Sequence, residues 1–137
     1  MLMVKKLLLL FPALTFLCTN ISFAQQQDSS GVFVSNIPFD LESPISIECD
    51  GFASINHPLM KRRHIENKDS LALLDSFLAK VKYKRKNNDI DTRGHVLYIK
   101  PGFAPVSICL NYWDIIVNGR LLRHNDKFLE FLKSMMG

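Results

Sequence analysis

Two stretches of the chain repeat apolar residues every three or four positions, which is the spacing of one helix face. The first follows Asp69 and has the apolar positions Leu71, Leu74, Phe77, Leu78 and Val81. The second follows Asn125 and has the apolar positions Phe128, Leu129, Leu132, Met135 and Met136. The candidate capping residues are Asp69 or Ser70 for the first helix and Asn125 or Asp126 for the second. The pattern therefore predicts two amphipathic helices, the first ending in a lysine-rich stretch at residues 80–86.

Alternation with a period of two predicts the strands. Residues 45–49 alternate apolar and polar side chains, so Ile45, Ile47 and Cys49 are expected on one buried face. Residues 95–100 are rich in β-branched and aromatic side chains, and residues 106–117 alternate up to a break expected at Asp114. Asn118-Gly119 is the strongest short hairpin signal, because both residues tolerate a positive φ. A short strand at residues 120–122 is therefore expected to return beside the previous one, and residues 32–34 offer a further short strand.

These elements define the fold class. Their order, β-α-β-β-β-α, predicts an α+β protein in which two helices pack on a small antiparallel sheet of about four strands. Residues 50–68 follow neither period and are predicted to be a long loop with an edge strand near residues 64–66. The chain has 137 residues, which suits one domain over residues 32–137 after a polar, disordered tail at residues 25–31.

The first 24 residues have the three parts of a secretory signal peptide. Lys5 and Lys6 precede an apolar run at residues 7–18, and the small residues Ser22 and Ala24 precede three glutamines. We expect cleavage after Ala24 and export to a periplasm or out of the cell. The alternative is an uncleaved anchor, but the apolar run is shorter than the roughly 20 residues of a spanning helix. No stable membrane insertion is therefore expected after cleavage.

Cleavage also lowers the net charge. The whole chain carries 17 Lys and Arg against 13 Asp and Glu, a formal charge of +4. Removing Lys5 and Lys6 leaves 15 basic residues and the same 13 acidic ones, a net charge of +2. A net charge this small disfavours nucleic acid as a partner, because proteins that bind nucleic acids normally have a concentrated basic face. A protein or a cell-envelope component is the expected partner.

Cys49 and Cys109 are the two cysteines that remain after cleavage. In an exported protein two cysteines most simply form one disulfide, with two buried free thiols as the alternative. The absence of a Cys-x-x-Cys motif disfavours a redox-active pair. If both residues lie on regular paired strands, alternation can place their sulfurs on opposite faces of the sheet. A disulfide then needs a bulge, a strand end or a covered second face.

Signals for catalysis are sparse. The histidines are His57, His64, His95 and His124. A small secreted hydrolase of the nuclease type would use His57 and His64 as acid and base, with a nearby arginine stabilising the phosphorane. The sequence has no zinc-ligand spacing, phosphate loop or nucleophile motif, so neither a metal nor a cofactor is expected. The absence of these motifs favours a binding module over an enzyme. A structural envelope-associated domain is the further alternative.

The candidate binding residues come from two basic clusters and one aromatic pair. The first cluster consists of Lys61, Arg62, Arg63 and His64, and the second includes Lys84 and Arg85. If the two lie side by side, they form a patch for phosphate, lipid headgroups or an acidic partner, and otherwise they are solvated faces. Trp113, next to Tyr112, is the candidate recognition aromatic, although a lone Trp in a short strand is more often a core residue.

Overall fold

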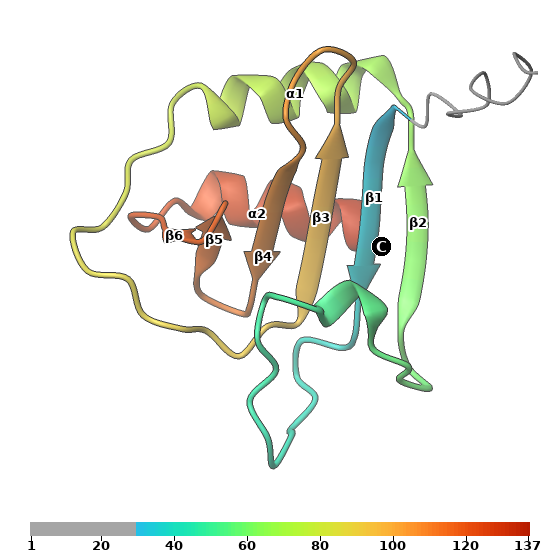
Figure 1. Cartoon of the computed structure of the whole chain (residues 1–137), viewed down its shortest axis with the longest axis vertical. Coiled ribbons are helices and arrows are strands. Elements are labelled where there is room, and N and C mark those ends of the chain that lie inside the picture. The colour runs from blue at the N-terminus through green and yellow to red at the C-terminus, as the bar shows by residue number, and fades with distance from the viewer. Residues whose placement is uncertain (1–29) are drawn as a thin grey trace, which may run out of the picture.

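The structure is a computed structural model of the chain and describes residues 30–137. At its centre is one antiparallel sheet with the strand order β2-β1-β3-β4-β5-β6 (Figure 1). The strands are β1 (Gly31–Asn36), β2 (Lys61–Ile65), β3 (Gly94–Ile99), β4 (Val106–Leu110), β5 (Ile115–Val117) and β6 (Arg120–Leu121). The helices are α1 (Lys68–Leu78) and α2 (Asp126–Met136), with a short 3-10 helix, η1 (Phe52–Ser54), before β2. The predicted α+β class is confirmed, but the described sheet has six strands instead of about four.

The signal-peptide prediction and most of the predicted tail lie outside the described residues. The tail is predicted to extend to residue 31, whereas β1 already begins at Gly31. Neither helix of the described chain has the length and hydropathy needed to cross a bilayer.

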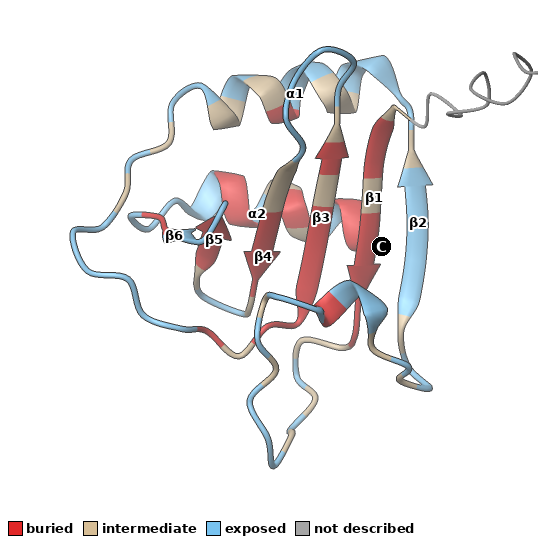
Figure 2. Ribbon diagram, in the orientation of Figure 1, coloured by how far each residue is buried: buried red, intermediate tan, exposed pale blue. Residues whose placement is uncertain are grey.

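Both helices pack on the same face of the sheet, behind the strands in Figure 1. The sheet contributes alternate residues of its central strands to this core, among them Val34, Val96 and Ile108. From α2 come Phe128 and Leu132, which are fully buried. Figure 2 shows that β1, β3 and much of α2 are buried, while β2 at the sheet edge is exposed. The predicted apolar helix faces therefore meet one face of the sheet.

Two of the six strands come from segments with weak sequence signals, and both lie at the β2 side of the sheet. The short strand expected at residues 32–34 is β1, which pairs with β2 on one side and β3 on the other. The edge strand expected near residues 64–66 is β2, which spans Lys61–Ile65 and turns the predicted loop into a sheet edge.

The start of α1 differs from the prediction. Asn67 caps the helix, because its Oδ1 accepts the N–H groups of Asp69 at 2.9 Å and Ser70 at 3.1 Å. The helix ends at Leu78, so the lysine-rich stretch at residues 80–86 follows the helix and supplies no basic residue to its last turn. The prediction that the first helix ends within this lysine-rich stretch is therefore wrong.

Three local signals in the second half of the chain are confirmed. Asn125 caps α2, with its Oδ1 accepting the N–H of Phe128 at 3.0 Å. Asn118 and Gly119, with φ values of 47° and 78°, form the tight turn between β5 and β6. The long alternating stretch divides into β4 and β5, and the break includes Asp114 as predicted.

Residues 45–49 do not form the predicted strand, and Ile45, expected on its buried face, is 74% exposed. Ile47 instead bonds to the segment before β3. Its N–H donates to Asp91 Oδ1, and its carbonyl accepts the N–H of the residue after Asp91, both at 2.8 Å. Cys49, two residues further on, is bonded to β4. Ile47 and Cys49 are therefore both attached to the sheet, which accounts for their spacing of two residues. They belong to a loop and not to a strand with a ladder of backbone hydrogen bonds.

Residues 37–60, which we call the covering loop, connect β1 to β2. Most of this loop lies below the sheet in Figure 1, and its middle part, around Cys49 and η1, passes in front of the lower strand ends on the face opposite the helices. The guanidinium of Arg93 donates to the carbonyl of Leu41 at 2.8 and 3.2 Å. Phe52 of η1 is completely buried. The loop is thus held at both its beginning and its middle.

The predicted disulfide between Cys49 and Cys109 is confirmed, with the two Cα atoms 5.7 Å apart. Cys109 is on β4 and faces away from the helices, while Cys49 reaches it from the covering loop. Strand alternation would have placed the two sulfur atoms on opposite faces of the sheet only if both cysteines lay on paired strands. Cys49 lies on no strand, so this obstacle to the disulfide does not arise.

Candidate functional site

The first predicted basic cluster forms β2, and its two arginines hold other elements in place. Arg62 Nη2 donates to the carbonyls of Ala53 at 3.1 Å and Ile55 at 3.0 Å, in and just after η1 of the covering loop. Arg63 Nη1 donates to the carbonyl of Met135 at 3.1 Å, in the last turn of α2. Both guanidinium groups therefore have intramolecular acceptors, so they are less free for a partner than the sequence suggests.

His64 also has neighbours within the fold. Its ring stacks on Phe33, with centroids 4.3 Å apart and an interplanar angle of 5°. Its Nε2 donates to the carbonyl of Ser30 at 3.1 Å, and its Nδ1 lies 3.6 Å from a carboxylate oxygen of Glu66. Lys61 is different, because its ammonium forms no ion pair within the described chain.

The second basic cluster lies at the other edge of the sheet. Tyr83 pairs with Leu122, close to β6, and Lys84 Nζ is 3.7 Å from Asp114 Oδ1. Arg85 follows in the exposed loop after this bridge. Since β2 and β6 are the opposite edges of the sheet, the two clusters do not lie side by side. The fold therefore provides no joint basic patch from them.

Trp113 is on the surface and not in the core. It lies in the turn between β4 and β5 with an exposed fraction of 66%, and its neighbour Tyr112 is 49% exposed. Their rings meet edge to face with centroids 4.6 Å apart. Two exposed aromatic side chains in one short turn are typical of a recognition surface.

A cavity of about 480 Å³ opens beside this turn, at the C-terminal end of α2, and we call it the α2-end cavity. Its apolar wall consists of Pro38, Phe39, Leu59, Tyr112 and Met136. Its polar wall consists of Asn36, Lys61, Glu130 and Lys133, together with Gly137. The end of β1, the beginning of β2, the covering loop, the aromatic turn and α2 all contribute to it. Its volume lies in the range of small-molecule sites, about 300–1,000 Å³.

The ammonium of Lys133 is positioned at this cavity by two aromatic residues. Its Nζ donates to the carbonyl of Tyr112 at 3.1 Å and lies 4.4 Å from the centroid of the Tyr112 ring. The ring of Phe39 is 5.5 Å away from the same atom. Cation–π contacts of this kind orient a lysine without neutralising it. Lys133 forms no ion pair within the described chain, so its charge is available to a ligand.

Asn36 also lines this cavity, but its Oδ1 is buried and does not open into it. The residue is 9% exposed, and its Oδ1 has no hydrogen-bond partner among the described residues. A buried carbonyl oxygen without a partner costs about 1–3 kcal/mol, and such groups are rare in folded proteins. Asn36 pairs with Gly94 of β3, which brings no side chain toward its carboxamide. The unsatisfied oxygen is therefore a cost at the end of β1 and not a group that the cavity presents to a ligand.

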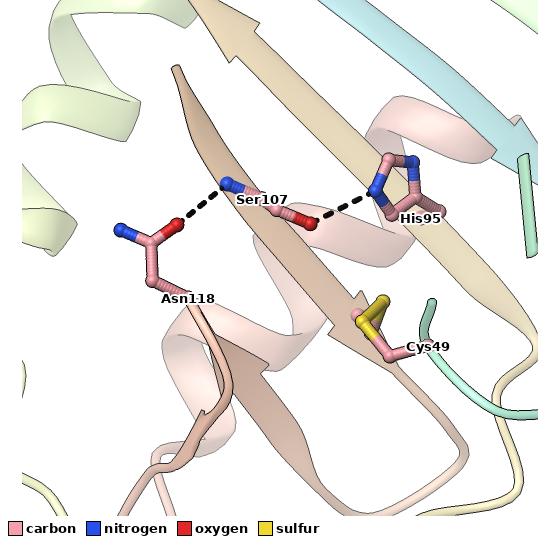
Figure 3. Close-up of a disulfide and its surroundings, with 5 residues drawn as sticks. Cys49, His95, Ser107 and Asn118 are labelled. Atoms are coloured by element: carbon pink, nitrogen blue, oxygen red, sulfur yellow. Dashed lines mark hydrogen bonds between the residues drawn. A yellow bond between two sulfur atoms is a disulfide. The ribbon is translucent and has the colours of Figure 1, made fainter. Parts of the chain in front are cut away.

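A second cavity, of about 360 Å³, lies beside the disulfide and includes Ser107 (Figure 3). Ser107 Oγ is 3.0 Å from His95 Nε2, and burial lowers the pKa of His95 below its usual value. A hydroxyl next to a neutral imidazole has the geometry of a nucleophile and its base. The carboxylates around the cavity are those of Glu48, Asp50 and Asp89.

The Ser107–His95 pair lacks the other groups that acyl transfer requires. No described residue hydrogen-bonds to the second ring nitrogen of His95. The N–H of Ser107 donates to Asn118 Oδ1 at 2.9 Å, and the N–H of Asn118 donates to the Ser107 carbonyl at 2.8 Å, so neither can stabilise an oxyanion. The pair is therefore best described as a link between β3 and β4.

The structure does not bring together the histidines of the hydrolase hypothesis. His57 precedes β2 and its Nδ1 accepts the N–H of Leu59 at 3.1 Å. His64 lies three residues beyond Lys61, the first residue of β2. Three residues of a strand span about 10 Å, so His64 lies about that far along β2, whereas His57 comes before the strand begins. Over residues 30–137, no group of His, Cys, Asp and Glu is arranged to hold a metal ion.

Most residues of the α2-end cavity carry no local sequence signal. Asn36, Phe39, Glu130 and Lys133 belong to no motif, whereas Tyr112, Lys61 and Met136 are named from the sequence for other reasons. No protein-family model matches the chain, and neither a curated protein nor a solved structure shows significant similarity to it.

Proposed function

We propose that the protein is an exported, disulfide-stabilised binding module without catalytic activity, whose partner is a protein or another cell-envelope component. The observation that carries this proposal is the α2-end cavity. There two lysines that form no ion pair within the described chain lie next to an exposed aromatic turn. Unpaired polar groups beside apolar walls are the usual composition of a ligand site.

The binding part is tested by crosslinking in the host cell. A photoreactive amino acid replaces Leu59, which lines the cavity and is exposed. The matched control carries the same amino acid at Lys82, an exposed position outside the cavity. We expect a discrete adduct from position 59 that is absent from position 82. No adduct at either position, or the same adducts at both, would contradict the proposal.

The export part is tested by the intact mass of the protein from its host. We expect a chain that begins at Gln25 and whose Cys49 and Cys109 react with an alkylating reagent only after reduction. A chain that retains Met1 and has both of these thiols free would contradict export. The disulfide of the fold supports this expectation, because such bonds persist in oxidising compartments.

A further inference from the structure

We infer that the outer edge of β2 docks an extended, acidic segment of a partner polypeptide, which adds to the sheet as a further strand. This surface goes beyond the proposed function, because it differs from the α2-end cavity and shares with it only Lys61. Three properties of β2 favour such a partner. Its backbone is open on one side, its course is regular, and its cations have no ion pairs.

The backbone of β2 is bonded on one side alone. All five residues of the strand pair with β1 in an unbroken antiparallel register. In such a ladder alternate residues direct their N–H and C=O groups away from the neighbouring strand. Within residues 30–137, no backbone group outside β1 bonds to β2, which forms the right-hand border of the sheet in Figure 1. Alternating outward donors and acceptors are complementary to another extended polypeptide.

The opposite border of the sheet is closed. β6 has two residues, and residues 82–84 run beside it. The N–H of Lys84 donates to the carbonyl of Leu121 at 2.9 Å, and the N–H of Arg123 donates to the carbonyl of Lys82 at 2.7 Å. The fold therefore covers one edge of the sheet with its own chain and leaves the other edge open.

β2 also lacks most of the devices that protect an edge strand. Such strands are commonly very short, or are interrupted by a proline or a bulge. β2 has neither a proline nor a bulge. Its five residues span roughly 17 Å of extended backbone. Charged side chains are the protection that remains, and charge excludes some strands while it attracts others.

The side chains of β2 favour an acidic partner. Lys61, Arg62 and Arg63 form no ion pair within the described chain. The two arginines donate hydrogen bonds, but their acceptors are neutral backbone carbonyls, which leave the positive charge uncompensated. Each guanidinium has five N–H donors and uses those of one terminal nitrogen in these bonds. The other donors are available to carboxylates.

The carboxylates beside β2 are too few to balance its charge. Glu130 and the C-terminal residue Gly137 line the α2-end cavity together with Lys61 and Lys133, and no ion pair joins them to either lysine. The three cations of β2 and Lys133 therefore stand against two carboxylates, so an excess of positive charge remains at this border.

The cations lie on both faces of the sheet. Directly paired residues of neighbouring strands share a face. Arg63 pairs with the core residue Val34, so it lies on the helix side, and so does Lys61. Arg62 pairs with Ser35 and lies on the side of the covering loop. A strand added beside β2 alternates in the same way, so consecutive acidic residues in it would meet cations on both faces.

The test measures binding of fluorescent, end-capped heptapeptides to the purified mature protein by anisotropy. One peptide has three consecutive glutamates flanked by valine and threonine, and a second has glutamines in their place. We expect the glutamate peptide to bind roughly tenfold more tightly, which corresponds to about 1.4 kcal/mol for three cross-strand charge pairs. Equal affinity for the two peptides, or no binding of the glutamate peptide, would overturn the inference.

N-methylation separates strand addition from a purely ionic contact. Two further glutamate peptides carry N-methyl groups on their odd or on their even residues. An added strand uses only one of these two sets of N–H groups to bond to β2. We therefore expect one methylated peptide to lose its binding and the other to keep it. Unreduced affinity of both would show that the cations bind acidic peptides without pairing of backbones.

A charge reversal assigns the affinity to β2. Lys61→Glu is the variant of choice, because the Lys61 side chain is exposed and forms no ion pair within the described chain. We expect it to reduce the affinity for the glutamate peptide at least tenfold. Lys82→Glu, an exposed position at the opposite border of the sheet, makes the same change of charge and should bind as the wild type does. Equal losses in the two variants would assign the effect to net charge.

Hydrogen exchange adds a readout that does not depend on a variant. Saturation with the glutamate peptide should slow the exchange of alternate backbone amides within β2, because these become bonded to the added strand. Protection elsewhere in the protein without protection in β2 would place the peptide at another surface and contradict the inference.

Two other occupants of the edge are outcomes of the same experiments. Binding of phosphatidylglycerol vesicles that Lys61→Glu abolishes, without binding of the peptide, would indicate a membrane surface. Sedimentation of the protein alone would reveal a dimer that the same variant dissociates, if a second copy occupies the edge. Either result overturns the inference and leaves the proposal for the α2-end cavity in place, because that proposal is tested by the adduct at position 59.

Discussion

Cys49 and Cys109 join a loop without regular structure to a buried strand of the sheet, 60 positions away in the sequence. On the chain-entropy account, a crosslink over this length stabilises the folded state by about 4 kcal/mol, because it restricts the unfolded chain. We expect the double variant Cys49→Ala/Cys109→Ala to lose about this amount in urea unfolding. Wild-type protein unfolded in the presence of a reductant should show a similar loss. Equal stability with and without the bond would contradict its structural role.

The ion pair of Arg93 with Asp91 gives the second prediction. Arg93 Nη1 and Nη2 donate to the two Asp91 oxygens at 2.7 and 2.8 Å, and the same guanidinium holds the Leu41 carbonyl. Burial raises the pKa of Asp91, but its hydrogen bonds with Arg93 and Ile47 and the Arg93 charge outweigh this and lower it below 3.8. We expect Arg93→Met to reduce the free energy of unfolding by about 2 kcal/mol, less than for a fully buried pair, because the Asp91 side chain is 38% exposed.

Hydrogen exchange locates the effect of this variant. Loss of the guanidinium should raise the exchange rates of the backbone amides at Leu41 and Ile47 more than those of β4. A variant with lower stability but unchanged relative exchange in the covering loop would show that Arg93 does not hold that loop.

The burial of His95 predicts a dependence of stability on pH. Burial lowers the pKa of His95 in the folded protein below the ordinary value of 6.5. As the pH falls below about 6.5, the unfolded chain takes up a proton that the folded chain does not, so the free energy of unfolding decreases until the folded pKa is passed. His95→Gln removes this proton uptake and should flatten that part of the pH profile.

Ser107→Ala is the matched control for the pH profile, because it removes the hydroxyl partner and leaves the imidazole buried. Its free energy of unfolding should keep the decrease below pH 6.5. If His95→Gln and the wild type lose stability equally over this range, the decrease has another origin.

Gly119 provides a test of backbone strain at the hairpin. Its φ is 78°, and a Cβ built on it would meet nothing within 4 Å. Gly119→Ala should therefore destabilise the protein by about 1 kcal/mol through the left-handed backbone alone. Thermal unfolding measures this change, and an unchanged midpoint would show that the turn relaxes to another type.

Local signals in the sequence were sufficient for the helices and for the hairpin at Asn118, because each depends on residues that are close in the chain. β1 carried a weak signal, since a central strand with Val32, Phe33 and Val34 in succession shows little alternation. β2 has exposed side chains at every position except Ile65, so it has no apolar period at all. Both strands are defined by pairing across the sheet, which a pattern of adjacent residues does not reveal.

The candidate site was less predictable than the fold. Asn36 and Lys133 meet at one cavity although they lie in different halves of the chain, and neither stands out by residue type or spacing. The basic run at residues 61–64 stood out clearly, yet the arginines in it serve the covering loop and the end of α2. Composition identifies where charge is concentrated, but long-range contacts decide which charges have partners.

The same basic run also affects how copies of the protein meet. β2 is an edge of the sheet, and its outer side offers backbone groups to which another strand can be added. Antiparallel addition of a second copy's complete β2 there would set Arg63 opposite the same residue of its neighbour and Arg62 opposite His64. Repulsion between these arginines therefore opposes edge-to-edge pairing of two identical chains at β2, even where the protein is concentrated.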